Sequence, residues 1–557
     1  MKNTLNKDII EKINIDSIGI ITIISGLINI FSSITPSIKE RLGFLYNFIP
    51  TDVSSGAKFI TMFFGVFLIF LSINLLRRKK TAWYLAFIIF MISAILNLIK
   101  GFDYEEAIFF LILMSWIFVN RKYYNVLSDK PSIKDGIIRA IVSLVIIFVY
   151  GFIGSHIIYE RHNMELNLID GSKSVVNILV NSNIKGLEGI KYNKFIISFD
   201  ILFVSLSLYS FFKIVQPILI KNKPSKQEKL KATEILKSKS KFLISSFCLI
   251  GDKNYFFTNH NSLIAYKTSG RSCLVLGDPI GDEIFIEDDI KEFIEFGNKN
   301  DWNVYFYQAS DKYLDAYRKA NFSNFKIGRE AIVDSENFTL EGHENKKIRS
   351  IVKKIKENYS FKIYNPPIEN HFIHKLKSIT NDWLSSHNNK ENGGFAMGCI
   401  NDEYIKTTTF LTVENSKGDI EAFLNIIENK NNNEIGVDLM RRKINSENNG
   451  VMEFLFVELF NYAKSKNIKN VNLGLSPFYL VGESKEDKTM EKLFNFMYKN
   501  LNSIYNFKGL SLFKEKFHPK WESRYIIYKE GSSFINMGIA IIKINYNIIP
   551  GIFSKKE

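Results

Sequence analysis

Residues 420–474 read IEAFLNIIENKNNNEIGVDLMRRKINSENNGVMEFLFVELFNYAKSKNIKNVNLG. Ile420–Ile427 and Glu434–Met440 are strand-like runs joined by an asparagine-rich turn, which predicts a β-hairpin. Met452–Lys464 is apolar on most sides, which indicates a largely buried helix, and Val471–Gly474 has the composition of a short strand. A hairpin followed by a helix and a further strand predicts an α/β fold.

The same mixture of elements occurs upstream of this stretch. We expect a hairpin of Ser262–Thr268 with Ser272–Leu276, followed by a helix at Ile290–Asn298. A strand at Asn303–Gln308 and a second helix at Lys312–Ala320 come next. This repetition predicts two similar subdomains, at residues 242–340 and 341–530, with a C-terminal tail at 531–557.

Residues 1–220 have a different composition, dominated by Ile, Leu and Phe. Six apolar runs stand out: Ser17–Thr35, Phe59–Leu76, Ala82–Ile99, Ala107–Val119, Ala140–Ile158 and Phe195–Ile220. Most have the ~17–25 residues that a membrane-spanning helix needs, whereas Ala107–Val119 is short. We therefore predict a six-helix transmembrane domain at residues 1–220, which excludes a simple soluble enzyme. Few charges interrupt the runs, so nothing favours a transporter.

Basic loops predict the orientation of these spans. Arg and Lys residues concentrate between the second and third runs, between the fourth and fifth, and after the sixth. Because positive residues mark the cytoplasmic side, both termini and the α/β portion are expected in the cytosol. The net charge of +15 favours an anionic partner, either lipid or nucleic acid.

Two segments concentrate this charge. Residues 221–241 carry eight Lys and two Glu, which predicts a polybasic linker attracted to anionic lipid, or only the usual basic bias beside a membrane. Glu344–Lys356 predicts an amphipathic helix with a cationic face. Its candidate tRNA-binding residues are Lys346, Lys347, Arg349, Lys353 and Lys354. A solvated helix face is the alternative interpretation.

Familiar catalytic and cofactor motifs are missing from the chain. It has no GxxxxGK[ST] phosphate loop, no GxSxG nucleophile elbow and no HExxH zinc helix. His371 and His374 have no evident third ligand, the three cysteines are far apart, and Gly277–Gly281 has the pattern of a tight turn. We expect neither a metal ion nor a cofactor.

Charged residues gather instead near the end of the α/β portion. Asp438, Arg441 and Arg442 close the strand-like run of the hairpin. Phe513–Phe517 alternates aromatic and charged residues, so Lys514 and Lys516 are expected on one face of a strand, with Trp521 and Arg524 following. The cluster suits an enzyme acting on an anionic substrate, or a structural network of salt bridges.

At these residues the chain resembles the phosphatidylglycerol lysyltransferase family, also called multiple peptide resistance factors. The resemblance covers nearly all of residues 250–530. It is carried by Tyr255–Phe257, Gly270–Ser272, Gly277–Gly281, Val304–Gln308, Val437–Arg442, Asn449–Met452, Leu455–Glu458, Asn472–Gly474, Tyr505–Leu510 and Phe513–Phe517, with Pro519, Trp521, Glu522, Arg524 and Tyr525.

The resemblance implies a tandem acetyltransferase-like (GNAT) fold whose second half carries the active site. It also implies transfer of an aminoacyl group from aminoacyl-tRNA to a glycerol hydroxyl of phosphatidylglycerol. Residues 448–452, NNGVM, offer one glycine where acetyltransferases cradle pyrophosphate with several, which favours tRNA over acetyl-CoA as donor. Long family members carry a further N-terminal flippase portion that we do not find here, so synthesis without flipping is expected.

The roles of the site residues follow from this resemblance. Asp438 is expected to orient or deprotonate the lipid hydroxyl, or to recognise the α-amine. Arg441 would hold a phosphate, while Lys514 and Lys516 would stabilise the oxyanion or the adenosine phosphate. The remaining substrate-binding candidates are Arg442, Asn472, Gly474, Ser476, Tyr505, Asn506, Trp521 and Arg524.

Three alternatives remain open from the sequence. The family suggests lysine as the transferred group and lysyl-tRNA as donor, giving a lipid that repels cationic antimicrobial peptides. Alanyl or another aminoacyl transfer to the same lipid would use the same residues. A tRNA-dependent peptide ligase of cell-wall precursors would share the fold, and a non-enzymatic tether would share the charge. The sequence gives no indication of oligomeric state.

Overall fold

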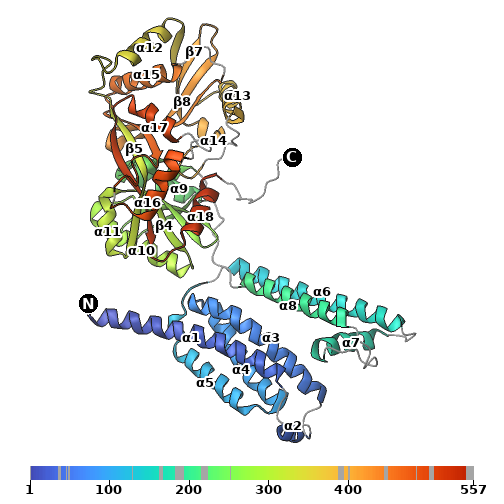
Figure 1. Cartoon of the computed structure of the whole chain (residues 1–557). Helices are drawn as coiled ribbons and strands as arrows, with labels where there is room; N and C mark the ends of the chain where they lie inside the picture. Colours follow the sequence, from blue (N-terminus) through green and yellow to red (C-terminus); the bar gives the residue numbers. More distant parts are fainter. Residues whose placement is uncertain are drawn as a thin grey trace. The chain divides into compact units, whose positions relative to one another are not determined.

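The computed structural model describes most of the 557 residues. The described ranges are 2–35, 39–45, 47, 51–127, 130–161, 167–181, 193–214, 224–250, 253–386, 394–398, 400, 402–444, 450–484, 486–500 and 507–546. The chain divides into two compact units, one of Met1–Leu219 with Asn298–Asp301 and one of Ile220–Gly297 with Trp302–Glu557 (Figure 1).

The first unit is helical. Its helices are α1 (Lys2–Ile34), α2 (Lys39–Leu45), α3 (Thr51–Leu76), α4 (Lys80–Gly101), α5 (Tyr104–Val119), α6 (Lys130–Arg161), α7 (Leu168–Asn181) and α8 (Asn193–Ile214), with a 3-10 turn η1 at Arg121–Tyr123. Helices α1 and α3 approach closely because a Cβ atom on Gly26 would lie only 2.5 Å from the carbonyl oxygen of Gly65.

All six predicted apolar runs fall in helices, as far as the structure describes them; residues 215–220 of the last run lie outside the described ranges. By length and composition five described helices can cross a membrane, namely α1, α3, α4, α6 and α8. Helix α5 has 16 residues and is short for a span, as its apolar run indicated. The amphipathic helix α7 was not predicted, because its 14 residues are too few for a span.

The second unit contains one eleven-stranded sheet in the order β1-β2-β3-β4-β11-β5-β10-β9-β8-β7-β6. Its strands are β1 (Asn254–Phe257), β2 (Leu263–Ser269), β3 (Ser272–Leu276), β4 (Asn303–Ser310), β5 (Phe322–Asp334), β6 (Tyr359–Tyr364), β7 (Thr409–Asn415), β8 (Ile420–Asn429), β9 (Glu434–Arg442), β10 (Asn470–Pro477) and β11 (Lys520–Lys529). The predicted hairpins β2–β3 and β8–β9 are both confirmed.

Helices pack against this sheet (Figure 1). They are α9 (Lys226–Lys239), α10 (Ile286–Lys299), α11 (Leu314–Lys319), α12 (Lys346–Lys356), α13 (Asn370–Ser386), α14 (Asp402–Ile405), α15 (Val451–Ser465), α16 (Thr489–Asn500), α17 (Phe507–Glu515) and α18 (Phe534–Tyr546). Short 3-10 turns are η2 (Leu243–Leu249), η3 (Glu283–Phe285), η4 (Asp311–Tyr313) and η5 (Lys430–Asn432). The predicted helical membrane-type region followed by a tandem GNAT-like α/β fold is thus confirmed.

The two predicted halves share a sheet and exchange a strand. Each half contains a parallel pair joined by one helix: β3 and β4 through α10, and β9 and β10 through α15. Strand β11, predicted within the second half, lies instead between β4 and β5 of the first. The division at residue 340 is therefore wrong for β11, because strand pairing depends on contacts that sequence order does not reveal.

The segment predicted as a linker, 221–241, is also structured in its described part. Ser225 caps α9 by accepting the Glu228 N–H, and the Glu228 side chain accepts the Ser225 N–H, which is a capping box. Ala232, Ile235 and Leu236 of α9 are buried in the core of the α/β unit. The lysine content concealed this apolar stripe, so describing these residues as a linker was wrong.

Candidate functional site

The two parallel strand pairs differ in one respect that locates the candidate site. Strands β3 and β4 pair from Ser272 opposite Asn303 to Leu276 opposite Tyr307, and the Gly277 N–H continues the ladder to the Tyr307 carbonyl. Strands β9 and β10 pair only from Glu434 opposite Asn470 to Gly436 opposite Asn472, and beyond these residues β9 stays paired with β8 and β10 with β5. Of the two parallel pairs that the structure describes, only the second therefore opens, and it lies in the half where the active site is expected.

Asp438 lies on β9 just beyond the last paired residue. Its Oδ1 accepts the Gly398 N–H at 2.8 Å, and its Oδ2 accepts the hydroxyl of Tyr404 on α14. Burial raises the pKa of this carboxyl, while the hydrogen bonds from Tyr404 and Gly398 and the charge of Arg441 oppose the rise. A carboxylate with a raised pKa and unused lone pairs is suited to accept a proton.

A bulge in strand β8 supports this arrangement. The register between β8 and β9 shifts at Asn425, whose Oδ1 accepts the Leu439 N–H at 2.7 Å and whose Nδ2 donates to the Tyr404 hydroxyl at 3.1 Å. Asn425 is fully buried, so it fixes Tyr404 and through it Asp438.

Arg441 also lies on β9, near Asp438 as predicted. Its guanidinium lies 4.2 Å from the ring centroid of Trp383 on α13, and its Nη1 donates to the Met440 carbonyl at 2.8 Å. Stacking on an indole holds a cation in place with its charge intact. Arg442 follows at the exposed end of the strand.

Lys514 borders the opening from the side of β10. Its Nζ donates to the carbonyl oxygens of Gly474 and Leu475, at 2.9 and 3.0 Å. A Cβ atom on Gly474 would lie 3.9 Å from this Nζ and 3.8 Å from the carbonyl oxygen of Val437, the residue before Asp438. Burial lowers the pKa of Lys514 to about 7. The lysine thus occupies the space where β9 and β10 separate.

The predicted strand at Phe513–Phe517 is wrong. Residues Phe507–Glu515 form helix α17, and Lys516 follows it in a turn. Lys514 is buried, whereas Lys516 is exposed and pairs with Glu453 at 2.7 Å. The aromatic residues Phe513 and Phe517 both pack on Phe456 of α15, and this tertiary contact produced a pattern that resembled strand alternation.

Three further predicted residues lie on β10. Asn472 is buried, donates to Glu434 Oε1 at 3.0 Å and accepts the Gly474 N–H at 2.8 Å. Gly474 has a φ of +80°, which favours glycine at the point where the strand leaves β9. Ser476 is fully buried, and its Oγ has no hydrogen-bond partner among the described residues. Asn472 holds the strands together, and Gly474 and Ser476 follow where they part.

The structure does not place Arg524 and Trp521 beside Asp438. Arg524 is buried in a pair with Glu330 of β5, and Trp521 Nε1 donates to Glu515 at 2.9 Å. Trp521 also packs on Tyr479, with ring centroids 4.5 Å apart. Tyr505 and Asn506 lie outside the described residues.

The basic helix α12 is confirmed and lies against α15. Its apolar residues Ile348, Val352 and Ile355 are buried, and a Cβ atom on Gly450, the N-cap of α15, would lie 2.5 Å from Ile351. The predicted tRNA-binding residues are all exposed: Lys346, Lys347, Arg349, Lys353 and Lys354. Arg349 additionally donates to the Gly342 carbonyl at 3.1 Å.

Sequence reasoning missed several residues around Asp438, namely Trp383, Gly398, Tyr404 and Asn425. They come from three elements and a loop and form no motif, so only the fold brings them together. Asn425 had one available signal, since it is a polar residue in an otherwise apolar strand-like run.

An acetyltransferase-like sheet with one open parallel pair, in a chain whose described part also carries five helices suited to a membrane, defines the class of protein: an α/β unit of the acetyltransferase type combined with membrane-type helices. Comparison with known proteins identifies the family. A family model described as phosphatidylglycerol lysyltransferase, C-terminal, matches residues 233–528, more than half of the chain. The chain belongs to the phosphatidylglycerol lysyltransferase family.

Individual relatives agree with this assignment. The phosphatidylglycerol lysyltransferase of Bacillus subtilis (strain 168) is 27% identical over 523 residues, 93% of this chain and 58% of the relative. That of Staphylococcus haemolyticus (strain JCSC1435) is 30% identical over 54% of this chain and 36% of its own. The solved structure of L-PGS from Bacillus licheniformis is 28% identical, with a TM-score of 0.51, covering 59% of this chain and 99% of the other. The chain thus spans little more than half the length of the Bacillus subtilis relative.

Proposed function

We propose that this protein transfers lysine from lysyl-tRNA to the terminal glycerol hydroxyl of phosphatidylglycerol. The observation that carries the proposal is the opening between β9 and β10, with Asp438 and Lys514 on its two sides, in a chain of this family. The product has a net positive charge and reduces the attraction of cationic antimicrobial peptides to the membrane.

The reaction requires only groups of the chain and its substrates. The lipid hydroxyl oxygen forms a bond to the carbonyl carbon of the aminoacyl ester, and the bond from that carbon to the tRNA ribose oxygen breaks. Asp438 takes the proton of the attacking hydroxyl and returns it to the departing ribose oxygen, so the carboxylate is regenerated. The ammonium of Lys514 stabilises the negative charge on the carbonyl oxygen as it forms.

Aminoacyl-tRNA as the donor, in place of acetyl-CoA, is supported by the start of α15. Acetyl-CoA enzymes place a pyrophosphate at such a helix terminus. Here Ile351 of α12 packs against Gly450, and Glu453 in the first turn pairs with Lys516. The exposed cations of α12 offer several phosphate contacts to a longer polyanion.

Helices α16 and α17 provide a face suited to the lipid acceptor. Leu493, Phe496 and Leu512 are 47%, 61% and 54% exposed. Exposed lysines accompany them on the same two helices, at Lys492, Lys499 and Lys508. Apolar side chains among cations suit the surface of a leaflet containing anionic lipid, and α17 also carries Lys514 into the site. We place this face against the cytosolic leaflet, in agreement with the basic loops between the spans.

Lipid mass spectrometry on a heterologous host tests the proposal. Expression of the chain should produce lysyl-phosphatidylglycerol, and Asp438→Asn should reduce it at least 100-fold at equal membrane abundance. Asp315→Asn, whose carboxyl is 84% exposed on α11, is the matched control and should keep full activity. A product with the mass of alanyl-phosphatidylglycerol would mean that alanine, and not lysine, is the transferred amino acid. An unchanged lipid profile from well-inserted protein would overturn it in favour of a peptide ligase or a tether.

A further inference from the structure

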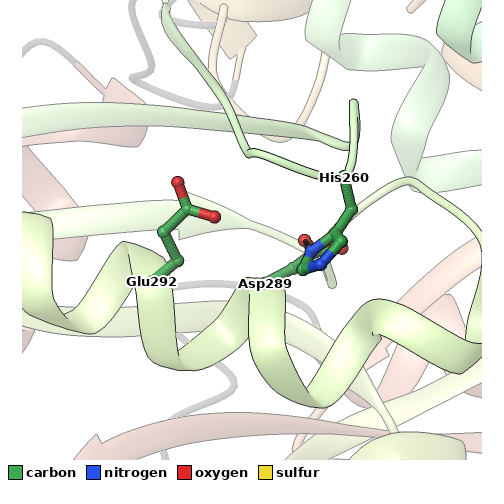
Figure 2. Close-up of side chains that lie close together, drawn as sticks. All are labelled: His260, Asp289 and Glu292. Atoms are coloured by element: carbon green, nitrogen blue, oxygen red, sulfur yellow. Dashed lines mark hydrogen bonds and ion pairs between the residues drawn. The ribbon is translucent and has the colours of Figure 1, made fainter.

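A second cluster of polar side chains lies at the first half of the sheet, on elements that contribute nothing to the opening between β9 and β10. His260 comes from the turn between β1 and β2, and Asp289 and Glu292 lie one turn apart on α10 (Figure 2). One potential ligand atom from each residue lies within 4.8 Å of the other two.

Two contacts orient the His260 ring. It stacks on Phe285 with ring centroids 4.3 Å apart and planes 5° from parallel. Its Nδ1 lies 3.1 Å from Asp289 Oδ1, so one edge of the ring faces the carboxylate. Glu292 is held as well, because its Oε2 accepts the Asn259 N–H at 3.0 Å.

The burial of Asp289 points to a bound cation independently of the geometry of the cluster. Its side chain is fully buried, and Oδ2 has no hydrogen-bond partner among the described residues. No Lys or Arg in the described chain forms an ion pair with Asp289; its one recorded ion-pair partner is His260. Burying a carboxylate oxygen without a donor or cation costs free energy, which a bound cation would recover.

We propose that His260, Asp289 and Glu292 bind one Zn²⁺ ion, with water in the fourth position. One imidazole nitrogen and two carboxylates are common zinc ligands, and tetrahedral coordination at ~2.0–2.2 Å places ligands about 3.4 Å apart. The three potential ligand atoms now lie within 4.8 Å of one another, so binding requires small rotations of the Glu292 and His260 side chains to reach that spacing. The ion neutralises both carboxylates and fastens the β1–β2 turn to α10, so its role is structural.

No sequence motif predicts this site, because His260 and Asp289 are 29 positions apart in the chain. The site is independent of the proposed transfer reaction, and zinc occupancy can therefore be measured apart from activity.

The test uses the full chain, purified in detergent with a tag that contains no histidine and stripped with EDTA. Titration calorimetry with Zn²⁺, together with metal analysis after dialysis, should give one equivalent for the wild type and an upward shift of the thermal unfolding midpoint. His260→Ala and Asp289→Asn should each weaken binding at least 100-fold. His374→Ala removes an exposed histidine on α13 and should bind as the wild type does.

Two results would overturn the site. One is a wild type that takes up no zinc after stripping. The other is zinc binding by His260→Ala that is as tight as in the wild type, which would place the ion elsewhere. If Asp289→Asn fails to fold, Glu292→Gln supplies the same comparison from the less buried ligand.

Discussion

Arg524 of β11 and Glu330 of β5 form an ion pair in the interior of the sheet. Arg524 Nε donates to Glu330 Oε2 at 2.9 Å, and the two side chains are 4% and 6% exposed. They are 194 residues apart in the chain, so the pair joins the C-terminal strand to the first half. Asn472 of β10 also reaches Glu330, at 3.4 Å, which extends this polar contact across three strands.

Removing one partner of this pair should destabilise the α/β unit strongly. Arg524→Met leaves Glu330 as an uncompensated buried charge, which costs about 3–5 kcal/mol of unfolding free energy. Differential scanning fluorimetry of the purified chain should show a large drop in unfolding temperature. Lys520→Met, which removes the exposed pair with Glu522, is the control and should change stability by less than about 1 kcal/mol.

The double variant Arg524→Met with Glu330→Met sharpens this test. Replacing both charges by apolar groups should restore much of the lost stability. Equal stability of Arg524→Met and wild type would show that the pair does not hold β11 in place.

The buried ammonium of Lys514 predicts a specific pH dependence. Its pKa in the folded protein is about 7, lowered from the usual value by burial and partly restored by Glu330. If Lys514 acts as a cation, the protonated fraction and hence kcat/KM should fall roughly tenfold per pH unit above about pH 7. Initial rates between pH 6 and 8.5 would show this falling limb.

Variants separate Lys514 from other sources of pH dependence. Lys514→Arg keeps a cation at every pH, so its falling limb should disappear even where the rate is reduced. Lys516→Met alters an exposed lysine and should keep the limb. A falling limb that persists in Lys514→Arg would assign the limb to another group.

The sequence predicted the elements of the fold better than their assembly. Both hairpins, the buried helix α15 and the basic helix α12 follow from local periodicity and turn residues, and all are confirmed. The position of β11 depends on pairing with β4 and β5, more than 180 residues earlier, which no local pattern records.

In the candidate site, too, residues on one strand were predictable, whereas residues brought in by other elements were not. Asp438 and Arg441 lie three positions apart on one strand and were predicted together, and Trp383 and Tyr404 were missed because helices elsewhere in the chain supply them. Lys514 was predicted at the site for the wrong reason, since it enters from a helix and not from a strand.

The apolar face of α16 predicts a dependence on the form of the lipid. Phe494 of α16 packs on Phe325 and Phe478, whereas Leu493 and Phe496 are 47% and 61% exposed. Leu493→Ser with Phe496→Ser removes apolar area that would be buried in the leaflet, so turnover of phosphatidylglycerol in nanodiscs should fall about tenfold. Turnover of a short-chain, water-soluble phosphatidylglycerol should remain near that of the wild type.

A matched control separates this effect from a general loss of exposed apolar surface. Ile284→Ser removes an apolar side chain that is 80% exposed on η3, away from α16 and α17, and should leave both activities unchanged. Equal losses on bilayer and soluble lipid in the double variant would argue against a membrane-docking face.

Helix α12 predicts a salt-dependent affinity for tRNA. Lys347, Lys353 and Lys354 are exposed on this helix, and each phosphate contact they make releases counterions. Changing all three to Gln should weaken tRNA binding and reduce the slope of log affinity against log salt concentration by about 2–3. Filter binding of lysyl-tRNA between 50 and 200 mM salt measures this slope.

A control for this prediction is Lys464→Gln with Lys466→Gln, at the other end of α15, which should leave the slope unchanged. An unaltered slope in the triple variant would mean that α12 is only a solvated surface, and the donor would then have to be bound by other cations of the unit.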